Sequence, residues 1–250
     1  MDYTVVLHHH GIEVTMRVAG TLGVPTDGII LYKDVWPKDS DFVGRLERGL
    51  AGSTNEYYSW KQAMVGDNDI MKDYRDCFDF KLRQADMPVP AEFADLGAVY
   101  EEVISGVREC VRHYSSIYNL SLEYEEATNF VKYGEGQHFA THPDSGFSYS
   151  CAVSAIGYIN DDYEGGEYMM PYKNLQFKPE FGDVIVHPSD FIYAHASLPV
   201  ASGTKYSAVT MYDYNDRNHQ EHGGSGGYTS AGMPGLGLPD ANSQVTLLGS

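Results

Sequence analysis

The chain has 250 residues, of which 42% are hydrophobic, so it is long enough to form one domain with a full core. It carries 17 lysines and arginines against 35 aspartates and glutamates, a formal net charge of −18. A negative field repels nucleic-acid phosphates and anionic membrane surfaces, so neither a nucleic acid nor a membrane is expected as a partner.

The cysteine content argues against a disulfide framework. The chain contains Cys77, Cys110 and Cys151, an odd number without a Cys-x-x-Cys spacing, so a cysteine zinc site is not expected either. No run of residues is apolar enough to span a membrane, and the first residues lack the pattern of a secretory signal. We therefore expect a cytoplasmic protein, and the sequence gives no indication of its oligomeric state.

Three regions are expected along the chain. Residues 1–24 alternate apolar and polar side chains and predict an N-terminal β-rich arm, in which the histidine run at residues 8–10 has no assigned function. Residues 25–217 form the main domain. Residues 218–250 are rich in glycine and poor in apolar side chains, which predicts a flexible tail in which His219 and His222 are solvated.

The first half of the main domain combines strands with helices. Residues 30–36 read as a strand, and a helix is expected after Ser40 because apolar residues follow at four-residue spacing. Residues 74–82 predict a further strand. Apolar residues then recur every three or four positions over residues 91–118, which predicts a long amphipathic helix that supports the sheet after it.

From Asn129 the apolar pattern changes to a period of two, with glycine turns between short segments. The pattern predicts an α+β, mainly β fold: a double-stranded β-helix, or jelly roll, over residues 129–214, with supporting N-terminal helices. The mouth of such a roll is a natural small-molecule site. The expected strands lie at residues 129–134, 138–144, 148–160, 166–172, 175–179, 183–188, 192–200 and 205–214.

Two histidines and an aspartate suggest a metal site. His142 and Asp144 stand two residues apart, so on a strand both side chains point to one face. A His-x-Asp pair alone has little specificity. With His195, on a later predicted strand, it completes two imidazoles and one carboxylate, a set that leaves coordination positions open and favours Fe(II) over zinc. The carboxylate ligand indicates hydroxylation rather than halogenation.

Lys205 suggests a second ligand. It follows His195 by ten residues, on an otherwise apolar and aromatic strand. A buried ammonium without a partner is costly, so an anion is the simplest companion. The distal carboxylate of 2-oxoglutarate would supply it, with the keto-acid end on the iron.

Four segments resemble one known family. YGEGQHFATHPD, at residues 133–144, resembles the Y-x-x-G-Q-x-x-x-x-H-x-D segment of prolyl 4-hydroxylase-like 2-oxoglutarate/Fe(II) dioxygenases. HASLPVASGTKY, at residues 195–206, resembles their H-x-x-x-P-V-x-x-G-x-K-Y segment. GYINDDYEGGEY looks like the strand and turn between them, and FKPEFGDVIVHPS is similar to their K-P-x-x-G-D-x-x-x-F segment, with His187 in place of the usual phenylalanine.

The resemblance implies a role for several residues. His142, Asp144 and His195 would be the catalytic iron ligands, and Lys205 would bind the C5 carboxylate of 2-oxoglutarate. Tyr133 looks like the family tyrosine whose hydroxyl contacts that carboxylate, and Tyr158 like a second tyrosine near the co-substrate. The implied cofactors are Fe(II), 2-oxoglutarate and O2, with ascorbate as reductant, and the implied substrate is proline in a peptide or protein.

Other interpretations remain open from the sequence alone. The same cofactor chemistry could act on a different side chain, a free amino acid or a nucleobase, although the net charge of −18 disfavours DNA. The chain could also be a non-enzymatic, metal-binding jelly-roll module. Arg75 could touch a substrate carbonyl, but we expect it to pair with neighbouring acidic residues.

Overall fold

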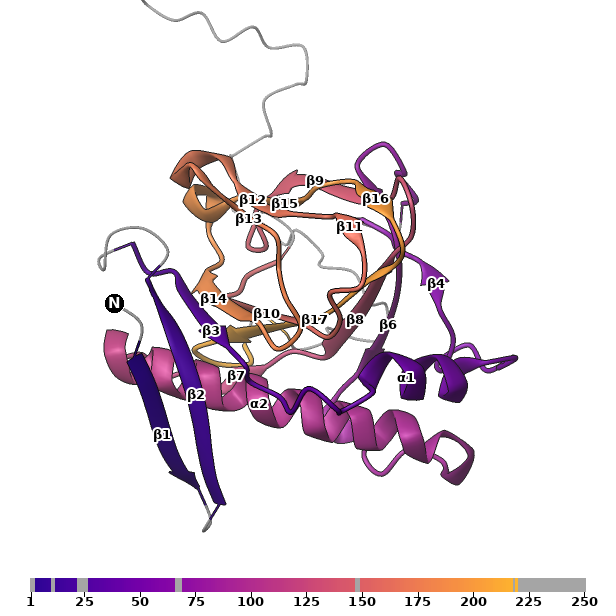
Figure 1. Ribbon diagram of the computed structural model, residues 1–250, viewed down its shortest axis with the longest axis horizontal. Helices are drawn as coiled ribbons and strands as arrows, with labels where there is room; N and C mark the ends of the chain where they lie inside the picture. Colours follow the sequence, from indigo (N-terminus) through magenta and orange to yellow (C-terminus); the bar gives the residue numbers. More distant parts are fainter. Residues whose placement is uncertain are drawn as a thin grey trace, which may run out of the picture. The chain divides into compact units, whose positions relative to one another are not determined.

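The computed structural model describes residues 3–9, 12–21, 27–65, 69–146, 149–217 and 219, with side chains from residue 27 onward. Apart from His219, the tail predicted over residues 218–250 lies outside the described residues. Two antiparallel sheets dominate the fold, and two α-helices accompany the larger one (Figure 1).

The major sheet contains ten strands in the order β1-β2-β3-β14-β10-β17-β8-β6-β4, with β7 paired to the end of β17. All of the pairings are antiparallel, as the glycine turns predict. The bounds are β1 Tyr3–His9, β2 Ile12–Thr21, β3 Ile30–Lys33, β4 Lys61–Gln62, β6 Phe78–Leu82, β7 Tyr124–Glu125, β8 Thr128–Tyr133, β10 Val153–Tyr158, β14 Val184–Pro188 and β17 Lys205–Asp213.

The minor sheet contains five strands in the order β13-β12-β15-β9-β5, and β11 pairs separately with β16. The bounds are β5 Arg75–Asp76, β9 His138–His142, β11 Glu164–Gly165, β12 Tyr168–Met170, β13 Leu175–Phe177, β15 His195–Ser197 and β16 Val200–Ser202. Short 3-10 helices lie at η1 Gln84–Asp86, η2 Ala91–Phe93, η3 Pro171–Lys173 and η4 Phe191–Tyr193.

Helices α1 Phe42–Leu50 and α2 Ala94–Tyr118 fall where the apolar spacing predicts them. The apolar face of α2 packs across the major sheet, and α1 lies against α2 (Figure 1). Each large apolar side chain removed from water contributes about 1.5–3 kcal/mol, so this shared core fixes the sheet that carries part of the site. Its α2 members include Leu96, Val99, Val103, Val107 and Tyr114.

Alternation along the strands divides the major sheet into two buried faces. On β3, Ile30 and Tyr32 join the helix-side core, while Leu31 joins a second core that includes Tyr168 of the minor sheet. The period of two places consecutive side chains on opposite faces, so a sheet buried on both sides reads as a continuous apolar run. One face of the major sheet is therefore left to line the space between the sheets.

The structure corrects three expectations. Residues 74–82 form two strands instead of one: β5 pairs with β9 in the minor sheet, and β6 pairs with β8 in the major sheet. The predicted strand over residues 138–144 ends at His142, so Asp144 lies in a bend. His219 is not solvated, because its side chain is 2% exposed and stacks on Tyr124.

The predicted N-terminal arm contributes the hairpin β1–β2, which extends the major sheet through β3. Within the described part of the chain, no helix has both the length and the apolar composition needed to cross a membrane.

Candidate active site

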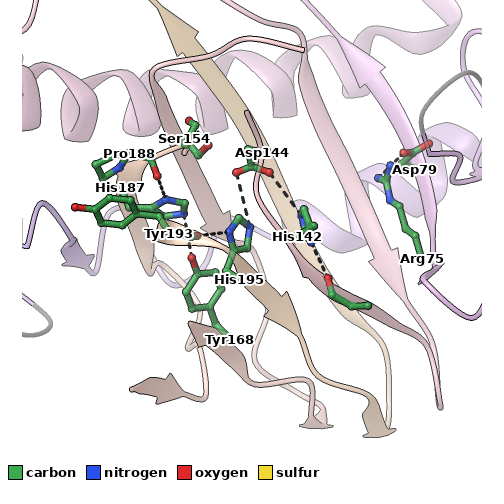
Figure 2. A network of polar contacts seen from close by, with 12 residues as sticks. Arg75, Asp79, His142, Asp144, Ser154, Tyr168, His187, Pro188, Tyr193 and His195 are labelled. Carbon is green, nitrogen blue, oxygen red and sulfur yellow. Dashed lines mark hydrogen bonds and ion pairs between the residues drawn. The ribbon is translucent and has the colours of Figure 1, made fainter. Parts of the chain in front are cut away.

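Three predicted ligands meet at one point between the sheets. Residues His142 of β9 and His195 of β15 pair directly across two neighbouring strands, and Asp144 follows β9 by two residues. Asp144 lies 3.6 Å from Nε2 of His142 through Oδ1 and 3.7 Å from Nε2 of His195 through Oδ2 (Figure 2). One ligand atom from each residue lies within 4.8 Å of the others.

Hydrogen bonds to backbone carbonyls fix both imidazoles in the tautomer that a metal requires. His142 Nδ1 lies 2.8 Å from the Ala140 oxygen, and His195 Nδ1 lies 3.2 Å from the Tyr193 oxygen (Figure 2). Because a carbonyl only accepts, each Nδ1 carries the proton and each Nε2 presents its lone pair. Orientation of ligand imidazoles through the other ring nitrogen is typical of metal centres.

The charge states of the site also suit a divalent cation. Burial lowers the pKa of His195 to about 3, so its ring is neutral at physiological pH. Burial alone would raise the pKa of Asp144. The neighbouring His195 and His142 outweigh this effect and bring the pKa below its ordinary value, so the carboxyl is ionised. Its Oδ2 is buried without a hydrogen-bond partner. An orphaned carboxylate oxygen beside two imidazole lone pairs fits Fe(II).

Lys205 lies on β17 of the major sheet, in a position that is 1% exposed. Its Nζ donates to the Gly166 oxygen at 2.7 Å and to Ser197 Oγ at 2.9 Å. Neither acceptor carries a charge, and Lys205 makes no ion pair within the described residues. Burial lowers its pKa to about 7, with a partial offset from the more distant Glu167.

The two predicted tyrosines lie beside Lys205. Tyr133 pairs with it across β8 and β17, and Tyr158 stands on β10, on the other side of β17. The Lys205 Nζ lies 5.5 Å from the centre of the Tyr133 ring and 5.2 Å from that of Tyr158. Burial raises the pKa of both phenols, so both remain protonated donors. The structure thus places all six predicted site residues within one region between the sheets.

Sequence reasoning missed the residues that support these six. Ser197 accepts from Lys205, and its position two residues after His195 on a strand was the available signal. Phe139 stacks on His142 at 3.5 Å between ring centres, and Arg75 lies 4.9 Å from the Phe139 ring. Arg75 pairs with Asp79 at 2.8 Å, as expected from its acidic neighbours (Figure 2).

Comparisons with curated proteins agree with this geometry. A protein of Acanthamoeba polyphaga mimivirus described as a putative prolyl 4-hydroxylase is 27% identical over 114 residues, which cover 36% of this chain and 46% of the viral protein. Procollagen-lysine,2-oxoglutarate 5-dioxygenase 1 of Rattus norvegicus is 33% identical over 73 residues, 29% of this chain and 10% of the rat protein. The matches thus span less than half of either relative.

A solved structure and a family model complete the comparison. The Trichoplax adhaerens prolyl hydroxylase, solved with a hypoxia-inducible-factor peptide, superposes with a TM-score of 0.57 at 15% identity, over 75% of this chain and 84% of that one. This similarity confirms the predicted jelly-roll fold. The model of the 2OG-Fe(II) oxygenase superfamily matches residues 128–213. The predicted resemblance to 2-oxoglutarate/Fe(II) dioxygenases is therefore confirmed, and residues 128–213 are the part of the chain that matches the superfamily model.

Proposed function

We propose that this protein is an Fe(II)- and 2-oxoglutarate-dependent dioxygenase that hydroxylates proline in a peptide or protein. The observation that carries the proposal is the convergence of His142, Asp144 and His195 on one point, with the buried Lys205 beside them. The proposal includes ascorbate as reductant and a cytoplasmic location. It includes neither a nucleic acid nor a membrane surface as partner.

The site residues have two roles, binding of the metal and binding of the co-substrate. His142, Asp144 and His195 would hold Fe(II), which when bound supplies the oxidative chemistry that converts 2-oxoglutarate and O2 to succinate and CO2 and hydroxylates the substrate. Lys205 would pair with the distal carboxylate of 2-oxoglutarate, a charge-assisted contact in a site that excludes water. The protonated phenol of Tyr133 would donate to the same carboxylate.

Proline as the substrate rests on the similar proteins and not on a contact in the site. The mimivirus relative is described as a putative prolyl 4-hydroxylase, and the similar solved structure is a prolyl hydroxylase with a bound peptide. The net charge of −18 suits a neutral or basic peptide. A lysyl side chain is the second candidate, because the rat relative is a procollagen-lysine dioxygenase and an acidic protein attracts a basic side chain.

The proposal is tested by succinate formation with Fe(II), 2-oxoglutarate, ascorbate and two peptide panels, one containing proline and one containing lysine. We expect succinate to form in proportion to a gain of one oxygen on the peptide, located by mass spectrometry. His142→Ala and Asp144→Ala should abolish both products and Mn(II) binding. His138→Ala is the matched control, because His138 lies on the same strand and its ring nitrogen Nε2 lies 3.3 Å from the Asp73 carbonyl oxygen instead of at the ligand cluster.

Three outcomes separate the candidates. Oxygen gained on lysine peptides alone would favour the second substrate. Turnover that survives both ligand substitutions would overturn the proposed site. Metal binding that 2-oxoglutarate does not affect, without turnover, would support a non-enzymatic metal-binding module.

A further inference from the structure

A buried polar pair, Tyr168 and His187, lies against the metal ligands without a part in the chemistry proposed above. Tyr168 stands on β12 of the minor sheet and is 3% exposed, whereas His187 stands on β14 of the major sheet and is fully buried. Nε2 of His187 lies 3.0 Å from the Tyr168 hydroxyl (Figure 2). The pair therefore joins the two sheets beside the site.

The direction of this hydrogen bond follows from the second nitrogen of His187. Nδ1 lies 2.7 Å from the Pro188 oxygen, which can only accept, so Nδ1 carries the proton. Nε2 is then an acceptor, and the Tyr168 hydroxyl donates to it. Each residue thus satisfies the other in a place without water access, and replacing one of them leaves the other unpaired.

Both rings of the pair touch His195. The Tyr168 ring stacks on the His195 ring with centres 5.2 Å apart and an interplanar angle of 23°. The His187 ring meets His195 edge-on at 5.0 Å and 68°. Since the Tyr193 carbonyl fixes only Nδ1 of His195, these two rings restrict the remaining rotation of the imidazole.

Tyr168 also faces the co-substrate end of the site. It shares a buried cluster with Tyr158, and its backbone pairs with Ser197, the residue that accepts from Lys205. The family segment that residues 177–189 resemble carries phenylalanine at the position of His187, and phenylalanine could not accept from the Tyr168 hydroxyl.

We propose that Tyr168 and His187 form a hydrogen-bonded positioning pair that holds the ring of His195 in its ligand orientation. The proposal rests on the proposed function. It predicts that the two residues act as a unit, so that replacing either one disturbs the metal site more than replacing both.

The test is a double-mutant cycle read out by Mn(II) titration, by 2-oxoglutarate titration of the Mn(II)-loaded protein, and by Tm. Tyr168→Phe keeps the stacked ring but removes the hydroxyl, His187→Phe removes the acceptor, and the double variant removes both. We expect each single variant to weaken Mn(II) binding about 10-fold, because groups that orient a ligand imidazole have effects of this size. The double variant should return to within about threefold of the parent, since coupled residues are non-additive.

Thr210→Val is the matched control. Thr210 and Thr128 form a buried hydroxyl pair at 2.8 Å on β17 and β8, so this variant also leaves one buried hydroxyl without its partner. We expect it to lower Tm with no change in Mn(II) affinity.

The Mn(II) affinities and Tm values of these variants decide whether Tyr168 and His187 position His195 or only stabilise the fold. Single variants that lose Tm but keep the parental Mn(II) affinity would overturn the inference, and so would a double variant as weak as the two single effects multiplied. If His187→Phe does not fold, Tyr168→Phe alone decides, because parental Mn(II) affinity there excludes a positioning role. A parent protein that binds neither Mn(II) nor 2-oxoglutarate would overturn the proposed function itself, and the inference with it.

Discussion

Replacement of Lys205 by methionine should separate stability from co-substrate binding. Methionine is unbranched and similar in volume to lysine, but it is one atom shorter and lacks the ammonium. Lys205 is 1% exposed, and the hydrogen bonds of its ammonium to described residues go to two uncharged groups, the Gly166 carbonyl and the Ser197 hydroxyl. Without an anion beside it, a charged Lys205 is therefore unfavourable in the folded protein. The substitution therefore removes a cost to folding and, in the same step, the proposed partner of 2-oxoglutarate.

The size of the stability effect follows from the pKa of Lys205. Its fall from 10.5 to about 7 corresponds to about 5 kcal/mol, at 1.36 kcal/mol for each unit of pKa. Methionine also leaves the Gly166 carbonyl and the Ser197 hydroxyl without their donor, at about 1–3 kcal/mol each. Near neutral pH, the metal-free variant should therefore differ from the parent by a small amount, from about −1 to about +3 kcal/mol in the free energy of unfolding.

The pH dependence has a definite sign. The pKa of Lys205 is lower in the folded state than in the unfolded state, so folding is disfavoured at any pH at which the folded protein must carry the charged lysine. This cost to the free energy of folding is complete below about pH 7. Between about pH 7 and 10.5 the unfolded chain binds more protons, and the contribution of Lys205 to stability rises with pH. Lys205→Met should lack this rise, as measured by urea unfolding across that range.

Co-substrate affinity should respond in the opposite direction. Removal of one partner of a buried ion pair costs about 3–5 kcal/mol, so Lys205→Met should weaken 2-oxoglutarate binding to the Mn(II)-loaded protein at least about 100-fold. In the parent, affinity should fall about tenfold for each pH unit above 7, because the amine must take up a proton to bind. Calorimetry in buffers of different ionisation enthalpy would detect that uptake.

The matched control is Lys132→Met. Lys132 stands opposite Tyr206 on the strand beside Lys205, and its amine contacts Glu47 at 3.1 Å and the Trp60 ring at 4.7 Å, away from the site. It should bind 2-oxoglutarate like the parent. The reasoning fails if Lys205→Met retains the parental affinity, or if the parent takes up no proton at about pH 8.5.

Two further predictions concern single positions. Tyr133→Phe should raise the KM for 2-oxoglutarate by about 2- to 12-fold in steady-state succinate assays, because it removes one hydrogen bond worth about 0.5–1.5 kcal/mol. An unchanged KM would exclude the phenol as a contact of the co-substrate. Gly157→Ala should lower the free energy of unfolding by about 1–3 kcal/mol in urea titrations, because the added Cβ would lie 2.6 Å from the Trp36 ring in the core. The affinity for 2-oxoglutarate should not change. Wild-type stability of Gly157→Ala would show that the Trp36 ring can move.

His142 and Asp144 could be predicted as a pair from the sequence because their spacing is local. His142 and Asp144 are two residues apart, so any extended or bent backbone keeps both side chains within reach of one ion. That is why the site survives the end of β9 at His142, although the strand was expected to continue. The burial of Lys205 was predictable because the rest of its strand is apolar and aromatic.

Contacts between distant strands were not predictable in the same way. Nothing in the segment from residue 74 to 82 shows that the chain changes sheets at Cys77, because both halves have strand-like residues and the change is determined by their partners, β9 and β8. His219 was expected to be solvated because its segment is rich in glycine and poor in apolar side chains, yet it packs against Tyr124 and lies 3.1 Å from Asp213. Such tertiary contacts override local composition.

The two ends of the site belong to different sheets, and this explains why the motifs are spaced as they are. The histidine ligands lie on β9 and β15 of the minor sheet, whereas Lys205 lies on β17 of the major sheet. The ten residues from His195 to Lys205 carry the chain from one sheet to the other through β16. A ligand held by the metal at one end and by Lys205 at the other must therefore span the two sheets. Contacts such as Lys205 to Ser197 and Tyr168 to His187 join the two sheets there. Co-substrate binding should thus depend on how rigidly these contacts hold the sheets together, which places Tyr168 and His187 among the residues that determine affinity although neither is a ligand.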